Sequence, residues 1–307
     1  MRWTVLVLGL AAGCAAGEGK DTAGDRPELG SPGAPAALAE KSGSCPDLSA
    51  PGISTFTSGG EEHRVGVYFP KAKPEGMPVM FVWHGLTAPG FGDVIEQMVN
   101  PFDLDELARK QDMIVVVPES PVRNLVISDV LLWGILADAD READLRLFDD
   151  LRSCIVEGLA ADPWRVTSWG FSGGGLWNSL LIMDRSDVFA AAATASGGTD
   201  QDATPQLVYR SPARKELPVM LVDGGDNDIW PGGGISILDF KEATAAFRDE
   251  LVADGHYVLA CEHGSGHTVP VPYWSAIRKF LRQHVFGEPS PFQDGDVPVP
   301  DVCEEAG

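Results

Sequence analysis

Ser172 stands at the centre of a G-x-S-x-G pattern, residues 170–174, which follows a strand-like stretch at 166–169 and precedes a helix-like stretch at 176–183. A serine whose Oγ projects from so tight a turn has a strained backbone, and small residues two positions before and after it let strand and helix approach. Gly173 would leave its N–H free at the start of the helix, where it could stabilise an oxyanion. The chain has 35 glycines, so a plain glycine-rich connection is the alternative, but the flanking elements favour a nucleophilic serine.

Two later loops could supply the groups that activate such a serine. One loop after a buried apolar run holds Asp223, Asp226 and Asp228, and another holds His263 and His267. In a serine–histidine–aspartate relay, the imidazole takes the proton from the serine hydroxyl and the carboxylate orients the imidazole. We predict Asp228 as the acid and His267 as the base. Asp226 and Asp223 stay open as alternative acids, and His263 as an alternative base.

A third loop could complete the site. Residues 78–83 form a continuous apolar run, typical of a strand that is buried on both faces, and the run ends in a loop that begins at His84. A loop in this position can offer a backbone N–H to an oxyanion, and we predict that Leu86 provides it as the second donor beside Gly173. The alternative is a plain turn in which His84 is a structural hydrogen-bonding residue.

These residues need a framework that brings three loops together. Strand-like runs occur at 63–69, 78–83, 113–117, 166–169, 189–195, 217–222 and 257–261. Helical periodicity occurs at 103–111, 138–159, 176–183, 240–254 and 273–286. This alternation predicts an α/β fold with one doubly wound, mostly parallel sheet and helices on both faces. Ligands bind at the carboxyl ends of such strands, where the three loops would meet.

Composition and charge limit the classes of function. The net charge of −22 and the pI of about 4.5 leave no basic patch for nucleic acid, and they favour a neutral ester or amide over an anionic substrate. The acidic cluster 223–228 lacks the spacing of a calcium-binding loop, so we predict neither a metal nor a cofactor. The acidic residues of 138–159 are predicted to form a solvated helix face, and 287–307 to be irregular.

The amino terminus resembles a targeting signal. Residues 1–14 combine one positive charge, an apolar run and small residues before Cys14, as in a bacterial lipoprotein signal, although Leu10 stands one place early for the usual lipidation motif. We predict lipidation of Cys14, with simple secretion as the alternative. Residues 15–44 have almost no large apolar side chains and are predicted to be a flexible tether, followed by a single domain at 45–307. The protein is therefore expected to be secreted or an outer-membrane lipoprotein, and to meet the membrane only through the lipid.

The other four cysteines form an even set. They are Cys45, Cys154, Cys261 and Cys303, and none of them has C-x-x-C spacing. An even set in an exported protein indicates disulfides, and four cysteines allow three pairings. Cys45 and Cys303 lie near the two ends of the predicted domain, so the bridges are expected to fasten loose ends to the body. We favour Cys45 with Cys154 and Cys261 with Cys303.

Taken together, residues 78–270 resemble the polyhydroxybutyrate depolymerase and feruloyl esterase group of secreted α/β-hydrolases. The matching pieces are the loop that starts with His84 and Gly85, the pattern around Ser172, the Gly225-x-x-Asp228 loop, and a Gly-His-Thr-x-Pro motif around His267. Two departures are that Val269 replaces the tryptophan of the last motif, and that the group's His-Gly before the acid loop is absent. The resemblance implies an α/β-hydrolase fold and a Ser172–Asp228–His267 triad, and it says little about the substrate.

The sequence thus predicts a monomeric serine esterase that cleaves neutral carboxylic esters through an acyl-enzyme. The alternatives are a peptidase of the same fold and an inactive binding module. Three tryptophans, Trp133, Trp177 and Trp230, are candidates for an apolar pocket, while Trp133 and Trp177 could equally be packing residues. The remaining histidines, His63, His256 and His284, are expected to be ordinary surface or packing residues.

Overall fold

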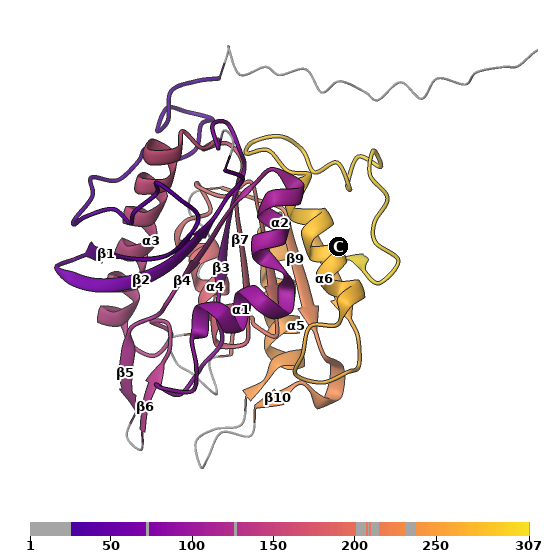
Figure 1. The fold of residues 1–307 in the computed structure, drawn as a ribbon. Helices are drawn as coiled ribbons and strands as arrows, with labels where there is room; N and C mark the ends of the chain where they lie inside the picture. The colour runs from indigo at the N-terminus through magenta and orange to yellow at the C-terminus, as the bar shows by residue number, and fades with distance from the viewer. Residues whose placement is uncertain are drawn as a thin grey trace, which may run out of the picture.

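The computed structural model describes residues 26–71, 74–125, 128–200, 207, 209, 215–230 and 238–306. Within these residues one sheet has the strand order β1-β2-β4-β3-β7-β8-β9-β12-β13 (Figure 1). Its strands are Gly52–Ser58 (β1), Glu61–Tyr68 (β2), Val79–Trp83 (β3), Ile114–Pro118 (β4), Val166–Phe171 (β7), Ala191–Ala195 (β8), Val219–Asp223 (β9), Val258–Glu262 (β12) and Glu304–Ala306 (β13). The six strands from β4 to β12 in this order run parallel, while β2 pairs antiparallel with β1 and β4, and β13 antiparallel with β12.

Helices cover both faces of this sheet. They are Val94–Phe102 (α1), Leu104–Gln111 (α2), Asp138–Leu159 (α3), Gly173–Asp184 (α4), Phe240–Ala253 (α5) and Val271–Arg282 (α6). The apolar residues of α3, α4 and α5 share one buried cluster with alternate residues of the strands, and those of α1, α2 and α6 share the other. The strands β3, β4 and β8 are buried at every position because both of their faces are covered. The predicted doubly wound α/β architecture is confirmed.

The segment before β1 differs from the expected flexible tether. Residues 26–44 lie against the body of the domain, and part of this segment runs along α3. Arg152 donates hydrogen bonds to the carbonyls of Ala36 and Ala37, and the Ser42 N–H donates to Asp150 Oδ1 at 2.9 Å. Backbone and side-chain hydrogen bonds replace the apolar side chains that this segment lacks, so its low hydrophobicity did not indicate how it packs. Residues 15–25, with Cys14 and the predicted signal, lie outside the described residues.

The polar face of α3 is also less solvated than the charge pattern suggested. Four of its charged side chains are buried, namely Arg141, Asp144, Asp150 and Arg152. Each has a partner outside the helix: Asp144 is bound by Arg123, Arg141 pairs with Asp184, and Asp150 also accepts a hydrogen bond from Ser58. Helical periodicity identifies the apolar face, but it cannot show that another segment covers the opposite one.

Two disulfides join the ends of the chain to this body. Cys45 is bonded to Cys154 in α3, and Cys261 in β12 is bonded to Cys303. The second bridge holds the last residues beside the sheet, where β13 pairs with β12, although this region was expected to be irregular throughout. Disulfides fit an oxidising compartment. None of the helices in the described residues is both long and apolar enough to span a membrane.

Besides the short strands β10 (Ile229–Trp230) and β11 (Leu238–Asp239), four further elements were not expected from the sequence. They are β1, α1 and a two-stranded hairpin of β5 (Val122–Leu125) and β6 (Ser128–Leu131). The strand β2, which corresponds to the strand-like run at 63–69, forms an antiparallel hairpin with β1 at one edge of the sheet. The hairpin matters for the site because Leu131 pairs with Thr87 in the loop after β3.

Candidate active site

Ser172 lies at the turn from β7 into α4, in the strained conformation that the glycine pattern predicts. Its φ is 59° and its ψ is −125°, which is rare for a residue with a side chain. A Cβ on Gly170 would lie 2.0 Å from the Gly174 carbonyl oxygen, and one on Gly174 would lie 2.1 Å from the Trp83 carbonyl oxygen. The two glycines are therefore required: a side chain at Gly170 would push β7 away from the start of α4, and one at Gly174 would push α4 away from the end of β3.

His267 and Asp228 lie beside this serine. The Ser172 hydroxyl is 2.8 Å from His267 Nε2, and His267 Nδ1 is 2.7 Å from Asp228 Oδ1. If the imidazole is neutral, Nδ1–H donates to the carboxylate and Nε2 accepts the serine hydrogen. The loops after β7, β9 and β12 thus bring together three groups that span 95 positions of the chain between Ser172 and His267.

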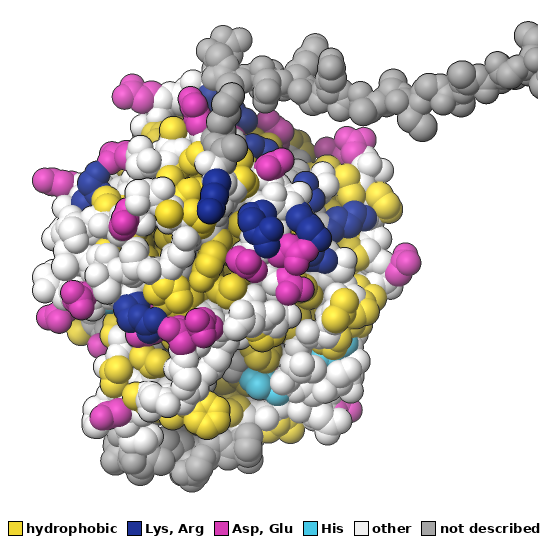
Figure 2. Space-filling view, in the orientation of Figure 1, with side chains coloured by type: hydrophobic (Ala, Val, Ile, Leu, Met, Phe, Trp, Pro, Cys, Tyr) yellow, Lys and Arg dark blue, Asp and Glu magenta, His cyan; other side chains and the backbone are white. Residues whose placement is uncertain are grey.

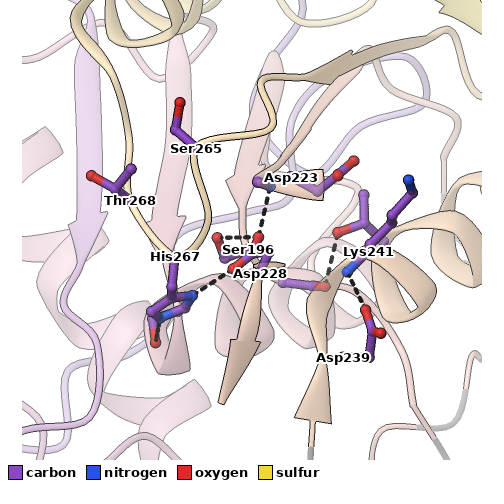
Figure 3. Close-up of polar contacts among 12 residues, drawn as sticks. Ser196, Asp223, Asp228, Asp239, Lys241, Ser265, His267 and Thr268 are labelled. Carbon is purple, nitrogen blue, oxygen red and sulfur yellow. Dashed lines mark hydrogen bonds and ion pairs between the residues drawn. The ribbon is translucent and has the colours of Figure 1, made fainter. Parts of the chain in front are cut away.

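The carboxylate of Asp228 is fully buried, and hydrogen-bond donors of the protein surround it in place of water. The backbone N–H of Gly224 and the hydroxyl of Ser196 each donate to Asp228 Oδ2 at 2.8 Å (Figure 3). Burial alone would raise the pKa of Asp228, but the hydrogen bonds from His267, Gly224 and Ser196 outweigh it and hold that pKa below its usual value. Asp228 is therefore an anion at neutral pH. The sequence did not point to Ser196, which no motif distinguishes from the other serines.

The alternative acids and the alternative base face elsewhere. Asp226 is exposed and pairs with Lys241 Nζ at 2.8 Å, which lowers its pKa. Asp223 accepts the N–H of Gly225, and partial burial raises its pKa to about 6. The His263 ring contacts its own loop, with Nε2 3.0 Å from the Thr268 carbonyl oxygen, and packs edge-on against Tyr273 with ring centroids 4.9 Å apart. Of these candidates, only Asp228 and His267 lie in line with Ser172.

Two aromatic rings hold the imidazole. Phe171 and Phe240 stack on His267 with ring centroids 4.8 and 4.7 Å away. Together with the hydrogen bonds at both ring nitrogens, this stacking leaves the imidazole one orientation. Phe240 was predicted only as the start of a helix, since nothing in its neighbourhood indicates that α5 begins beside the base. Its N–H also donates to the backbone carbonyl of Asp228.

The predicted oxyanion donors lie side by side. A Cβ on Gly173 would be 3.0 Å from the backbone nitrogen of Leu86, and one on Gly85 would be 3.1 Å from Ser172 Cβ. Within the described part of the chain, no carbonyl or side chain accepts the N–H of Leu86 or of Gly173. Gly173 is also the first residue of α4, where the helix dipole favours negative charge.

His84 fixes the loop that carries Leu86. It is buried, and its Nε2 accepts the Ser120 N–H at 3.0 Å, so the hydrogen must be on Nδ1, which donates to the Gly85 carbonyl oxygen at 2.7 Å. Burial lowers the pKa of His84 to about 4, so the ring is neutral at physiological pH. His84 is therefore the structural residue that the sequence offered as an alternative, and it supports the oxyanion loop.

The tryptophans divide into two groups. Trp133 and Trp177 are fully buried and pack with Trp83 in the core, with Trp83 centroids 5.0 and 6.1 Å from theirs, so they line no surface pocket. Trp230 is half-buried and lies in β10 (Ile229–Trp230), a short strand that begins directly after Asp228. Its adjacent prolyl residue 231 lies outside the described residues.

The site opens to solvent between apolar side chains. Large exposed hydrophobic residues occur in the segments that follow β3, β9 and β12: Leu86 and Phe91 lie in the loop after β3, Ile229 in β10, and Val271 at the start of α6. In Figure 2, hydrophobic side chains lie beside the histidine surfaces on the lower part of the molecule, the end toward which β9 points in Figure 1. Among the described residues, no group of three or more His, Cys, Asp or Glu side chains is placed to hold a metal ion.

The fold and the position of the site define an α/β-hydrolase fold, as the sequence predicted. No protein-family model matches the chain, and no curated protein matches its sequence. Solved structures do match it. The native structure of sOPH has 19% identity over 86% of this chain and 96% of its own, with a TM-score of 0.62. A structure of fungal esterases from Rhizomucor miehei has 13% identity over 76% of this chain and 83% of its own, with a TM-score of 0.54.

A carboxylesterase of Bacillus cereus is also similar, with 15% identity over 72% of this chain and 93% of its own and a TM-score of 0.50. Identities this low establish the common fold and no more. They do not test the resemblance to polyhydroxybutyrate depolymerases and feruloyl esterases, which stays a prediction.

Proposed function

We propose that the protein is a serine esterase that hydrolyses neutral carboxylic esters through an acyl-enzyme. The observation that carries this proposal is the continuous chain of hydrogen bonds from Ser172 Oγ through the His267 imidazole to the Asp228 carboxylate. Packing of the sheet and helices alone does not require these three polar groups to meet, one of them fully buried. Their arrangement is the one that converts a serine hydroxyl into a nucleophile.

In the first half-reaction, Ser172 Oγ bonds to the ester carbonyl carbon while its proton passes to His267 Nε2. The carbonyl oxygen becomes an oxyanion, which the N–H groups of Leu86 and Gly173 stabilise, each by about 3 kcal/mol. The imidazolium is stabilised by Asp228, which stays ionised. When the carbon–oxygen bond to the alcohol breaks, His267 returns the proton to the leaving alkoxide.

In the second half-reaction, water takes the place of the alcohol. His267 removes a proton from the water as its oxygen bonds to the acyl carbon, and the same donors hold the second oxyanion. The bond to Ser172 Oγ then breaks, His267 returns the proton to the serine, and the carboxylic acid leaves. No cofactor is needed for either step.

The surroundings favour an ester with an apolar part. Leu86, Ile229 and Phe171 lie around the triad, and the net charge of −22 would repel anionic substrates at long range. The comparisons named above include esterases and a carboxylesterase, which agrees with this substrate class. We further propose that the protein is exported, acts as a monomer without nucleic acid, and is held to a membrane only by a lipid on Cys14.

The test combines a covalent label with two substrates. A fluorophosphonate should label the wild type and fail to label Ser172→Ala, while Ser265→Ala, which alters an exposed serine of the His267 loop, should be labelled like the wild type. Hydrolysis of p-nitrophenyl acetate should exceed hydrolysis of a peptide p-nitroanilide. Preference for the anilide would indicate a peptidase, and a folded wild type that neither labels nor hydrolyses would indicate a binding module.

A further inference from the structure

Ser196, the residue after β8, has a backbone conformation that residues with a side chain seldom adopt. Its φ is 45°, in the left-handed region where glycine is favoured, and its side chain is buried. The next two residues are Gly197 and Gly198, so glycine is abundant where the chain turns. A strained serine kept at such a position suggests that its side chain has a task in the neighbouring site.

The end of β8 contacts both the nucleophile turn and the acid loop. The Ala195 carbonyl oxygen accepts the N–H of Ser172 at 3.1 Å, and the Ser196 N–H donates to the Val222 carbonyl oxygen at 2.8 Å. The Ser196 hydroxyl donates to Asp228 Oδ2 at 2.8 Å. Two consecutive residues thus connect the backbone of the nucleophile with the side chain of the acid, and Figure 3 shows Ser196 next to Asp228 and His267.

The other donor to Asp228 Oδ2 cannot replace this connection. Gly224 belongs to the same loop as Asp228, four residues before it, so its hydrogen bond moves with the loop. Ser196 directly follows β8, which pairs with β9, and it holds the carboxylate relative to β8. When Ser196 and Gly224 both donate hydrogen bonds to Oδ2, Oδ1 faces His267 Nδ1. If one of these two hydrogen bonds is lost, the carboxylate can rotate about its Cβ–Cγ bond.

We propose that Ser196 is a positioning residue of the active site: its hydroxyl, aimed by the left-handed turn after β8, orients the Asp228 carboxylate toward His267. This inference rests on the proposed esterase function. The strained backbone at Ser196 is then what directs its hydroxyl toward Asp228. A glycine in its place would relieve the strain but would provide no hydroxyl to orient the carboxylate.

Two substitutions separate the hydroxyl from the backbone. Ser196→Ala removes the hydroxyl and keeps the strain, while Ser196→Gly removes both. We expect kcat for p-nitrophenyl acetate to fall about tenfold in both variants, with KM nearly unchanged, because the hydroxyl acts on the acid and not on substrate binding. We also expect the Tm of Ser196→Gly to be at least as high as that of Ser196→Ala. The control is Ser153→Ala, which removes a buried hydroxyl of α3 that donates to the Ala39 carbonyl oxygen in the segment before β1; its Tm should fall while its kcat stays.

A spectroscopic measurement reports on the same contact. The His267 Nδ1–H that donates to Asp228 should give a downfield proton resonance in the wild type, and this resonance should weaken or move in both Ser196 variants but not in Ser153→Ala. An active wild type whose Ser196 variants keep both kcat and this resonance would overturn the positioning role and leave the esterase proposal intact. A folded wild type without ester hydrolysis would overturn both.

Discussion

Gly174→Ala should disable the site although it adds a single methyl group. The new Cβ would lie 2.1 Å from the Trp83 carbonyl oxygen and 2.6 Å from the His84 carbonyl oxygen. Both are backbone atoms at the point where β3 enters the oxyanion loop, so no side chain can rotate to make room. The start of α4 and the end of β3 must therefore move apart.

The size of the effect follows from this distance. Ordinary contact for a Cβ begins near 3.4 Å, so the two backbones must separate by roughly 1 Å, and Ser172 and Gly173 move relative to Leu86. A misplacement of ~1 Å at a reacting centre costs about a hundredfold in rate. We expect kcat/KM to fall by at least that factor, which corresponds to ~2.7 kcal/mol in the activation free energy, and the Tm to fall because the packing is overfilled.

The assay is p-nitrophenyl acetate hydrolysis by protein shown to be folded by circular dichroism, with the rate of fluorophosphonate labelling as a second readout. Gly158→Ala is the matched control, since Gly158 is also helical but its Cβ would meet only the terminal methyl of Leu48, at 2.6 Å. That side chain can move, so kcat/KM should stay within about twofold and alanine should add helix propensity. If Gly174→Ala kept kcat/KM within threefold of the wild type, the requirement for a bare backbone at this turn would be refuted.

Three further predictions concern the support of the site and of the fold. His84→Ala should lower kcat up to about a hundredfold by releasing the Leu86 loop, whereas His263→Ala, which removes a ring that contacts its own loop and Tyr273, should leave kcat nearly unchanged; equal losses in the two would contradict the assignment. Burial lowers the pKa of His84 and of His284 to about 4 in the folded protein. As the pH falls, these two imidazoles are therefore protonated in the unfolded chain before they are protonated in the folded protein. Folding stability that is present at pH 7 is lost between pH 6.5 and 4 for this reason. Between pH 7 and pH 5, each of these two histidines should lower the free energy of unfolding by about 2 kcal/mol. Urea titrations of His284→Gln at the two pH values should therefore show a smaller decrease in this free energy than the wild type. Replacing Cys45 and Cys154 by serine removes a crosslink across 109 positions, which restricts the unfolded chain, and should cost about 4–5 kcal/mol in urea denaturation, with activity retained at 25 °C; an unchanged midpoint would contradict a stabilising role for this bridge.

Much of the site could be predicted because its residues carry local signals. The glycines around Ser172 follow from the steric demand of one turn, and His267 and Leu86 lie in loops that follow short apolar runs typical of strands. The acid was harder, because Asp223, Asp226 and Asp228 all lie within six residues. Their roles differ through contacts made elsewhere: Lys241 holds Asp226 at the surface, while Ser196 and Gly224 hold Asp228 beneath His267.

Contacts between segments far apart in the sequence explain the remaining differences between the predicted and the observed fold. The face of α3 with Asp150 and Arg152 has the charge pattern of a solvated helix, and residues 26–44 have the composition of a linker. Each would be solvated alone, but together they satisfy each other's hydrogen bonds and become part of the folded body. Pairing of this kind gives no hydrophobic signal, either on the polar face of α3 or in residues 26–44.

By itself, the sequence determined the alternation of strands and helices and the strained turn at Ser172, since both depend on neighbours within a few residues. The order of serine, aspartate and histidine along the chain is read directly from the sequence. Only the tertiary structure decided which carboxylate faces the imidazole, that Phe171 and Phe240 enclose it, and that Ser196 reaches the acid from another strand. Those outcomes depend on the order of strands in the sheet, which places β8 between β7 and β9 and so puts its last residues in contact with both loops.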